Sequence, residues 1–219
     1  MSPSNEALIG ALLLGYVALI VILSKLLYNA LRGIGLGYYR AVYFVRKYIH
    51  VFGGGVVAFL TPFVFTSPLI PLVMGLVLAA GLALARATNK LMYWFQVPDN
   101  AYEVNFCIAW ALGIAILWLI TGNPWIAVTP ALLISIGDAV TGVVRNVVVG
   151  RRSKHWVGNL AMATVTVPLV GGLLGVPGML VAAVASVIER LEFGPIDDNV
   201  LIVLFSSAAL VVMHLMGLV

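Results

Sequence analysis

Long runs of apolar residues dominate the chain, and this feature restricts its fold more than any other. Hydrophobic residues make up 63% of the 219 positions and charged residues only 9%. A water-soluble domain is roughly half apolar and about a quarter charged. Because a helix needs roughly 20 mostly apolar residues to cross a bilayer, the sequence predicts an all-α, polytopic membrane protein in which residues 1–219 form a single integral membrane domain.

Eight apolar segments are candidate membrane-spanning helices. We expect spans at 7–24, 51–65, 68–85, 104–120, 125–144, 158–174, 176–188 and 200–218. Uncharged clusters of turn-forming residues separate some of them, for example at 175–178. The first residues carry no positive charge, so we expect the N-terminal segment to be the first span rather than a cleaved signal peptide.

The distribution of charge predicts how the bundle is oriented. Every lysine and arginine falls on one side of the eight-span arrangement, which the positive-inside rule makes cytoplasmic, with both termini outside. The predicted cytoplasmic loops, which we expect to form the site, are 25–50, 86–103, 145–157 and 189–199. All acidic residues except Glu6 also lie on or near this face. Acidic residues contribute little to membrane orientation, so their position on this face needs another explanation. A cytoplasmic site that binds metal ions and a polyanionic substrate would explain them.

Asp138 lies inside an otherwise apolar span, where an ionised carboxylate is destabilising. It should therefore face a polar cavity or a partner rather than lipid. One interpretation is a packing pair with Arg145, about two helical turns further on. The other is a ligand site, because the small residues Gly137, Ala139 and Gly142 leave space beside the carboxylate.

The first basic segment that could bind a substrate contains Arg46, Lys47 and His50. If this segment is helical, Arg46 and His50 share a face. Three glycines follow and allow close approach of a ligand or another helix. His50 is therefore either a packing histidine or a functional one.

A second basic segment, residues 145–155, ends the fifth predicted span and includes Arg151, Arg152 and Lys154. Guanidinium groups bind phosphate oxygens in a bidentate manner and a lysine acts as a point charge, so the segment is a candidate phosphate clamp. Membrane topology alone would also explain such a cluster. The segment does not contain the GxxxxGK[ST] pattern of a P-loop.

Acidic and amide residues at three predicted span ends are candidate metal ligands. They are Glu103, Glu189 and the group Asp197, Asp198 and Asn199. The helix dipole favours a carboxylate at the start of a helix, which gives Glu103, Asp197 and Asp198 a structural explanation and Glu189, at a helix end, a weaker one. Carboxylate and amide oxygens, together with phosphates and water, are also the ligands that Mg²⁺ prefers. The sequence thus predicts a nucleotide and metal site without specifying the reaction.

The order of these motifs resembles a known family. The ordered set is RKYIH at 46–50, Glu103 in AYEVNF, Gly137-Asp138-Ala139, the basic segment 150–154, Gly158-Asn159-Leu160-Ala161, Glu189 and Asp198-Asn199. It is similar to the polyprenol kinase family, which includes dolichol kinase and phytol kinase and is related to the phosphatidate cytidylyltransferases. These are multi-pass enzymes, and the dolichol and phytol kinases use CTP or another nucleoside triphosphate to phosphorylate a long isoprenoid alcohol.

The resemblance covers residues 46–199 and implies roles for matched positions. Asp138 matches an aspartate associated with nucleotide and metal binding, Lys154 matches a lysine before a glycine-rich turn, and Asp198 with Asn199 matches a late acidic–asparagine pair. The family commonly has a glutamate where this chain has Val157, and often a small residue where it has Arg145. Glu189 or Asp197 could supply the missing carboxylate.

The leading hypothesis is a kinase that transfers the terminal phosphoryl group of CTP, or of another nucleoside triphosphate, to a membrane-embedded isoprenoid alcohol with the help of Mg²⁺. The candidate catalytic residues are Asp138, His50 and Glu103. The candidate substrate- or nucleotide-binding residues are Arg46, Lys47, Arg151, Arg152, Lys154, Gly158 and Asn159. The candidate metal ligands are Asp138, Asp198, Asn199 and Glu189.

Two other functions use the same residues. A cytidylyltransferase would join CMP to a lipid phosphate and release pyrophosphate. A transporter or flippase would use Asp138 and the other carboxylates as ion sites, but it predicts functional charges near the membrane midplane and polar groups on both faces. We expect the partners to be membrane lipid and a nucleotide, and not nucleic acid, because the chain has only twelve basic residues and no soluble domain to present them.

Overall fold

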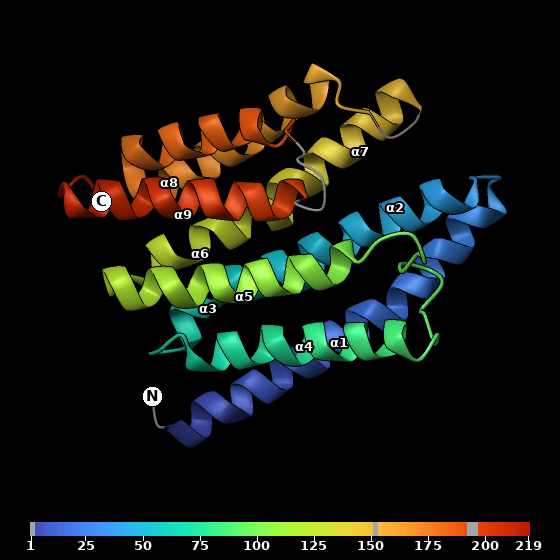
Figure 1. Cartoon of the computed structure of the whole chain (residues 1–219), viewed down its shortest axis with the longest axis horizontal. Coiled ribbons are helices and arrows are strands. Elements are labelled where there is room, and N and C mark those ends of the chain that lie inside the picture. Colours follow the sequence, from blue (N-terminus) through green and yellow to red (C-terminus); the bar gives the residue numbers. More distant parts are fainter. Residues whose placement is uncertain (1–2, 151–152, 192–196) are drawn as a thin grey trace.

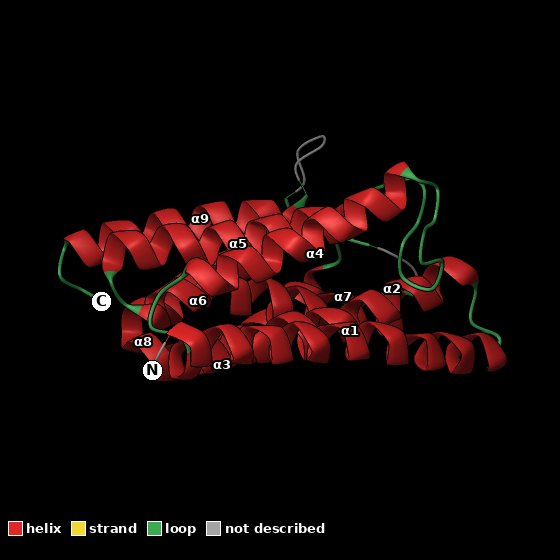
Figure 2. Cartoon of the chain, turned by 90° about the horizontal axis from the view of Figure 1, so that it is seen from below, coloured by secondary structure: helices red, strands yellow, loops and turns green. Residues whose placement is uncertain are grey.

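A computed structural model describes residues 3–150, 153–191 and 197–219, and in these ranges the chain is helical without strands (Figure 2). The helices are α1 (Pro3–Gly33), α2 (Tyr38–Ile49), α3 (Val56–Val64), α4 (Leu69–Ala87), α5 (Tyr102–Thr121), α6 (Pro124–Leu132), α7 (Asp138–Val149), α8 (Trp156–Ile188) and α9 (Asp198–Leu215). Two π-helical segments, η1 (His50–Gly55) and η2 (Leu133–Gly137), join α2 to α3 and α6 to α7. The all-α prediction is therefore confirmed.

Seven continuous helical runs in the described ranges are long and apolar enough to cross a membrane. Five of them are single helices, and the runs Tyr38–Val64 and Pro124–Val149 each combine two α-helices with a π-helical segment. This confirms a multi-pass membrane architecture. The number differs from the eight predicted spans because α8 contains both of the segments predicted at 158–174 and 176–188.

The helix α8 reverses direction at Gly175. This glycine has φ 66° and ψ −151°, a conformation that side chains on an L-residue disfavour. A straight helix of 33 residues would be about 50 Å long, yet Asn159 near one end donates a hydrogen bond to the backbone carbonyl of Ser186 near the other. Residues 156–174 and 176–188 are therefore two antiparallel helices, and they correspond to the sixth and seventh predicted spans.

Both chain ends lie at the same end of the bundle (Figure 1, left). This follows from the antiparallel order of the runs once α8 is counted as a hairpin. The described lysines and arginines belong to segments away from that end, namely the last third of α1, α2, the end of α4 with the turn after it, α7 and the segments that flank α8. The structure thus separates the charged end from the apolar remainder, as the sequence predicted. That the charged end faces the cytoplasm stays a prediction.

Several segments predicted as loops are helical. The predicted loop 25–50 contains the end of α1 and all of α2. The prediction was wrong here because α2 is amphipathic: Val42 and Val45 are buried, whereas its basic residues interrupt the apolar run that indicates a membrane span. α7 also continues to Val149, beyond the predicted end of its span at 144.

The run from α6 through η2 forms the centre of the bundle. Residues 126–135 are all buried, as expected for a helix that is apolar around its circumference. η1 packs against η2, and a Cβ atom on Gly54 would lie only 2.8 Å from Ser135 Oγ. The two π-helical segments therefore meet closely, and they position His50, the first residue of η1, near Asp138, which follows η2.

Candidate functional site

Asp138 lies against two side chains from the neighbouring run of helix. Its Oδ2 atom is 2.5 Å from Lys47 Nζ and 3.4 Å from His50 Nδ1. All three side chains are buried. Asp138 is therefore paired with Lys47. The packing interpretation of the sequence, which paired Asp138 with Arg145, is wrong.

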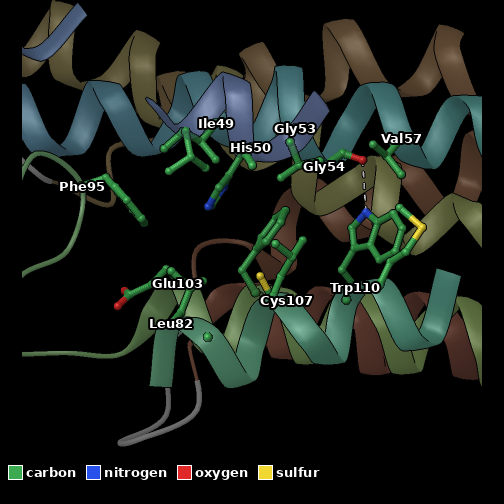
Figure 3. A pocket seen from close by; sticks show the side chains of 18 of the residues that line it. Ile49, His50, Gly53, Gly54, Val57, Leu82, Phe95, Glu103, Cys107 and Trp110 are labelled. Atoms are coloured by element: carbon green, nitrogen blue, oxygen red, sulfur yellow. Dashed lines mark hydrogen bonds between the residues drawn. The ribbon is translucent and has the colours of Figure 1, made fainter. Parts of the chain in front are cut away.

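His50 is fixed in place by an aromatic neighbour. Its ring stacks on Phe106 of α5, with the ring centroids 3.9 Å apart and an angle of 15° between the planes. The imidazole points from η1 toward α5 (Figure 3). Its Nδ1 atom is buried and makes no hydrogen bond of acceptable geometry within the described residues. A positioned imidazole with such a nitrogen can accept or donate a proton.

Three carboxylates converge from α7, the end of α8 and the start of α9. One oxygen atom from each of Asp138, Glu189 and Asp198 lies within 4.8 Å of the other two. Two oxygen ligands of one Mg²⁺ ion are up to about 4 Å apart, and those of Ca²⁺ up to about 5 Å. Asn199, which lines the same polar cavity as Asp138 and Asp198, has a buried Oδ1 atom that finds no hydrogen-bond partner among the described residues. These oxygens fit a divalent cation, and the carboxylates need to move only slightly closer to bind Mg²⁺.

Arg145 holds one of these carboxylates in a bidentate pair. Its two terminal nitrogens each lie 2.7 Å from an oxygen of Glu189. The guanidinium also donates to the backbone carbonyl of His155, at 2.8 Å, and to Asn159 Oδ1, at 2.9 Å. Gly158 leaves room for it, because a Cβ atom there would clash with Arg145. Gly158 and Asn159, predicted to bind substrate or nucleotide, thus contact Arg145 and do not line the polar cavity described below.

Lys154 links the third carboxylate to the end of the α8 hairpin. Its Nζ atom lies 2.9 Å from Asp198 Oδ2 and donates to the backbone carbonyl of Glu189 at 3.0 Å. Every carboxylate of the triad is therefore adjacent to a cation, which offsets much of the cost of burying the charges. Arg151 and Arg152, the other members of the predicted phosphate clamp, lie outside the described residues.

The carboxylate of Asp197 caps a helix, whereas that of Glu189 faces the other carboxylates of the cluster. Burial raises the pKa of Glu189 to about 7, although the neighbouring Arg145 acts in the opposite direction. Burial also raises the pKa of Asp197, whose carboxylate accepts hydrogen bonds from the backbone N–H of Val200 and from Asn105. Asp197 thus caps α9, whereas Glu189 belongs to the carboxylate triad.

Glu103 belongs to a separate ionic network. Its carboxylate accepts from Arg86 at 2.6 Å and from Gln96 at 2.9 Å, and lies 3.4 Å from Arg46. The carboxylate points away from His50 (Figure 3). With these donors around it, Glu103 fixes the 88–101 segment against α5, so its environment favours a structural role over the predicted catalytic one.

Two cavities meet beside the Asp138 cluster. A polar cavity of about 230 Å³ is lined by charged and amide side chains that include Lys47, Asp138, Asp198 and Asn199. An apolar cavity of about 430 Å³ lies between α1, η1, α4 and α5 (Figure 3). Three residues line both cavities: Arg46, His50 and Glu103. This arrangement can hold a molecule with a polar end and a long apolar part.

Arg40 is a cavity residue that the sequence analysis did not select. It lines the polar cavity, and its Nε atom donates to the neutral side chain of Asn146 at 2.9 Å. The other two basic residues of this cavity, Arg46 and Lys47, contact carboxylates. A periodic signal could have found Arg40, because residues 40, 43, 47 and 50 recur at the spacing of one helix face.

No family model, curated protein or solved structure matches the chain. Its class is therefore defined by the structure itself: a multi-pass helical membrane protein whose buried ionic cluster adjoins an apolar cavity. The chemistry of the site must be inferred from these side chains.

Proposed function

We propose that the protein is a kinase that transfers the terminal phosphoryl group of CTP, or of another nucleoside triphosphate, to the hydroxyl of a long-chain isoprenoid alcohol at the cytoplasmic membrane face. The observation that carries the proposal is the junction of the polar and apolar cavities at Arg46, His50 and Glu103. A lipid alcohol bound across this junction has its hydroxyl beside the ionic cluster. The order of motifs that resembles the polyprenol kinases supports the same reaction.

Phosphoryl transfer depends mainly on positioning and on stabilisation of negative charge. Lys47 and Arg46 present cations to the polar cavity, and Arg40 adds a third. Asp138, Glu189 and Asp198, with Asn199, would hold Mg²⁺. The ion, when bound, neutralises charge on the phosphate oxygens. Phosphates would then lie in the polar cavity, between these cations and the carboxylate triad.

His50 is the best-placed proton acceptor, because it lines both cavities. As the alcohol oxygen forms its bond to the terminal phosphorus, the bond from that phosphorus to the bridging oxygen breaks and a nucleoside diphosphate leaves. The hydroxyl proton passes to the imidazole of His50, on the ring nitrogen that does not face Asp138. Asp138, whose Oδ2 atom is 3.4 Å from the buried Nδ1 atom, stabilises the imidazolium that forms.

The positions of the described charges favour an enzyme over a transporter. The transporter hypothesis predicts polar groups on both membrane faces. Among the described residues, Glu6 is the one acidic residue at the end of the bundle that holds the termini. Its carboxylate accepts hydrogen bonds from the side chain and the backbone N–H of Thr66. Glu6 thus ties α1 to the turn before α4 and contributes nothing to the ionic cluster.

The position of a radiolabel tests the proposal directly. The purified protein in lipid nanodiscs is incubated with Mg²⁺, an isoprenoid alcohol and CTP labelled at either the α- or the γ-phosphorus. Label from γ-labelled CTP should enter the lipid, whereas incorporation from α-labelled CTP into a lipid phosphate would identify a cytidylyltransferase. Asp138→Asn should abolish incorporation, and Asp99→Asn, which alters an exposed carboxylate of the same cavity, should not. The same assay is repeated with labelled ATP, GTP and UTP, and the absence of label in the lipid with all four triphosphates would refute the kinase.

A further inference from the structure

The apolar cavity has polar groups at one end only. Arg46, His50 and Glu103 lie at this end, and the remaining lining residues are apolar, aromatic or glycine. Trp110 lines the deeper part, and its indole N–H is already bonded to the backbone carbonyl of Gly54 (Figure 3). The cavity therefore offers a hydrocarbon chain an apolar surface along its length and offers polar contacts at its end.

The cavity opens toward the bilayer between α1 and α4. Ile22 of α1 and Val77 of α4 both line it, and these residues are 64% and 54% exposed. Gly81 of α4 also lines it, and beyond its own helical turn no atom of the described residues lies within 4 Å of a Cβ placed there. A chain inside the cavity can thus continue into the surrounding lipid between these two helices.

Contacts at both ends of this opening limit its length. Toward the end of the bundle that holds the termini, Gly10 of α1 packs directly against Ile70 of α4. Toward the charged end, Trp94 donates a hydrogen bond to the backbone carbonyl of Val21 at 3.1 Å and joins the 88–101 segment to α1. The opening is therefore a lateral window between two fixed contacts, and not a general separation of the helices.

The volume of the cavity indicates how much of a lipid it can hold. An apolar cavity of about 150 Å³ holds one benzene ring. A cavity of about 430 Å³ is about three times larger, which corresponds to on the order of 15–20 carbon atoms. This is one hydrocarbon chain of moderate length, and two such chains would not fit.

We propose that the cavity binds a single-chain lipid alcohol. Roughly the first 15–20 carbons next to the hydroxyl would lie in the cavity, and the rest of the chain would leave through the window between α1 and α4. The identity of the lipid as an isoprenoid alcohol rests on the proposed function, but the binding of one chain in this cavity does not. Affinity then rises with chain length until the cavity is full and stays constant for longer chains.

Photo-crosslinking locates the chain without any need for turnover. Geranylgeraniol that carries a diazirine in the middle of its tail is bound to the protein in nanodiscs, irradiated, and its adducts are mapped by mass spectrometry. Adducts should fall on cavity residues such as Ile22, Val77 and Cys107, the only cysteine of the chain. Adducts confined to other faces of the bundle would overturn the proposal.

Two glycine substitutions provide a matched pair of variants. Gly81→Leu places a side chain in the window, whereas Gly15→Leu places the same side chain on the exposed surface of α1, where a Cβ also meets nothing within 4 Å. Gly81→Leu should weaken geranylgeraniol binding at least about tenfold, and Gly15→Leu should leave it unchanged. Equal binding by the two variants, with equal melting temperatures, would contradict the window.

A series of alcohols tests the length dependence. From geraniol through farnesol to geranylgeraniol the dissociation constant should fall at least about tenfold in total, and solanesol should bind no more tightly than geranylgeraniol. A continuous gain in affinity to solanesol would refute the cavity as the site. Binding and adducts as expected, with no phosphorylation, would leave this inference intact and refute the kinase.

Discussion

Lys47 Nζ lies 2.5 Å from Asp138 Oδ2, and only 9% of the lysine side chain and 3% of the aspartate side chain are exposed. The pair joins two membrane-spanning runs next to their π-helical segments. A buried ion is stable mainly because of its partner, so removal of one partner is more destabilising than removal of both. This property allows the role of the pair in folding to be separated from its role in turnover.

Asp138→Asn should therefore have two effects. Turnover should be abolished, and the free energy of unfolding should fall by about 3–5 kcal/mol, because Lys47 remains buried without its counter-ion. The double variant Lys47→Met/Asp138→Asn should recover most of the stability but no turnover. Thermal unfolding and transfer of the γ-label measure the two effects. A single variant with normal turnover would contradict the assigned role of Asp138, and a double variant as unstable as the single one would contradict the pairing.

The sequence predicted Asp138 as a functional residue but not its partner. A carboxylate in an apolar span is conspicuous because of its cost in lipid. Its partner Lys47 lies 91 residues away in the chain, and this contact depends on how α2 and α7 pack. Arg145, the candidate that helical spacing suggested, forms its bidentate pair with Glu189 instead. Local periodicity thus indicates which residues share a face but not which face of another helix they meet.

The same limitation explains the errors in the fold. Apolar runs predicted the spans well, and even the α8 hairpin follows from the break predicted between 174 and 176. The segment 25–50 was misread because α2 is amphipathic and its basic residues point into a polar cavity inside the bundle. For this reason the sequence did not indicate Arg40 as a residue of the site. A hydropathy pattern does not distinguish a charged residue in such a cavity from one in water.

Gly158→Ala should destabilise the protein by about 1–3 kcal/mol. The added Cβ would clash with the Arg145 side chain and displace the guanidinium from Glu189. Gly172→Ala is the matched control, because it lies in the same helical hairpin and a Cβ there meets no atom of the described residues within 4 Å beyond its own helical turn. Melting temperatures in the same detergent provide the comparison. If the two variants melt at the same temperature, the close approach of Gly158 to Arg145 has no energetic consequence.

Divalent cations should stabilise the protein against heating. A ligand that binds only the folded state contributes about 2.7 kcal/mol at a hundred times its dissociation constant. We expect Mg²⁺ to raise the melting temperature of the wild type, and EDTA to abolish turnover. Asp198→Asn removes one carboxylate of the triad and should remove the shift, whereas Asp99→Asn should retain it. A shift of equal size in both variants would place the ion elsewhere.

Arg40→Gln should weaken nucleotide binding. Arg40 contacts the neutral Asn146, so its charge remains available to a phosphate in the polar cavity. We expect the KM for the triphosphate to rise roughly tenfold or more, as for loss of a hydrogen bond to a charged group, with little change in kcat. Lys25→Gln is the control, because Lys25 lies over the rings of Tyr93 and Trp94. Steady-state kinetics distinguish the two variants. An unchanged KM in Arg40→Gln would exclude a contact between Arg40 and the triphosphate.

The orientation of the bundle can be measured with single cysteines. After Cys107→Ala, the substitutions Lys90→Cys and Ser67→Cys place one exposed thiol at each end of the bundle. A membrane-impermeant maleimide applied to intact cells should label the thiol at position 67 at once and the thiol at position 90 only after permeabilisation. This follows from the concentration of basic residues at the end that bears Lys90. Labelling in the reverse order would place the polar cavity outside the cell, away from the nucleoside triphosphates of the cytoplasm, and the kinase would lose its phosphoryl donor.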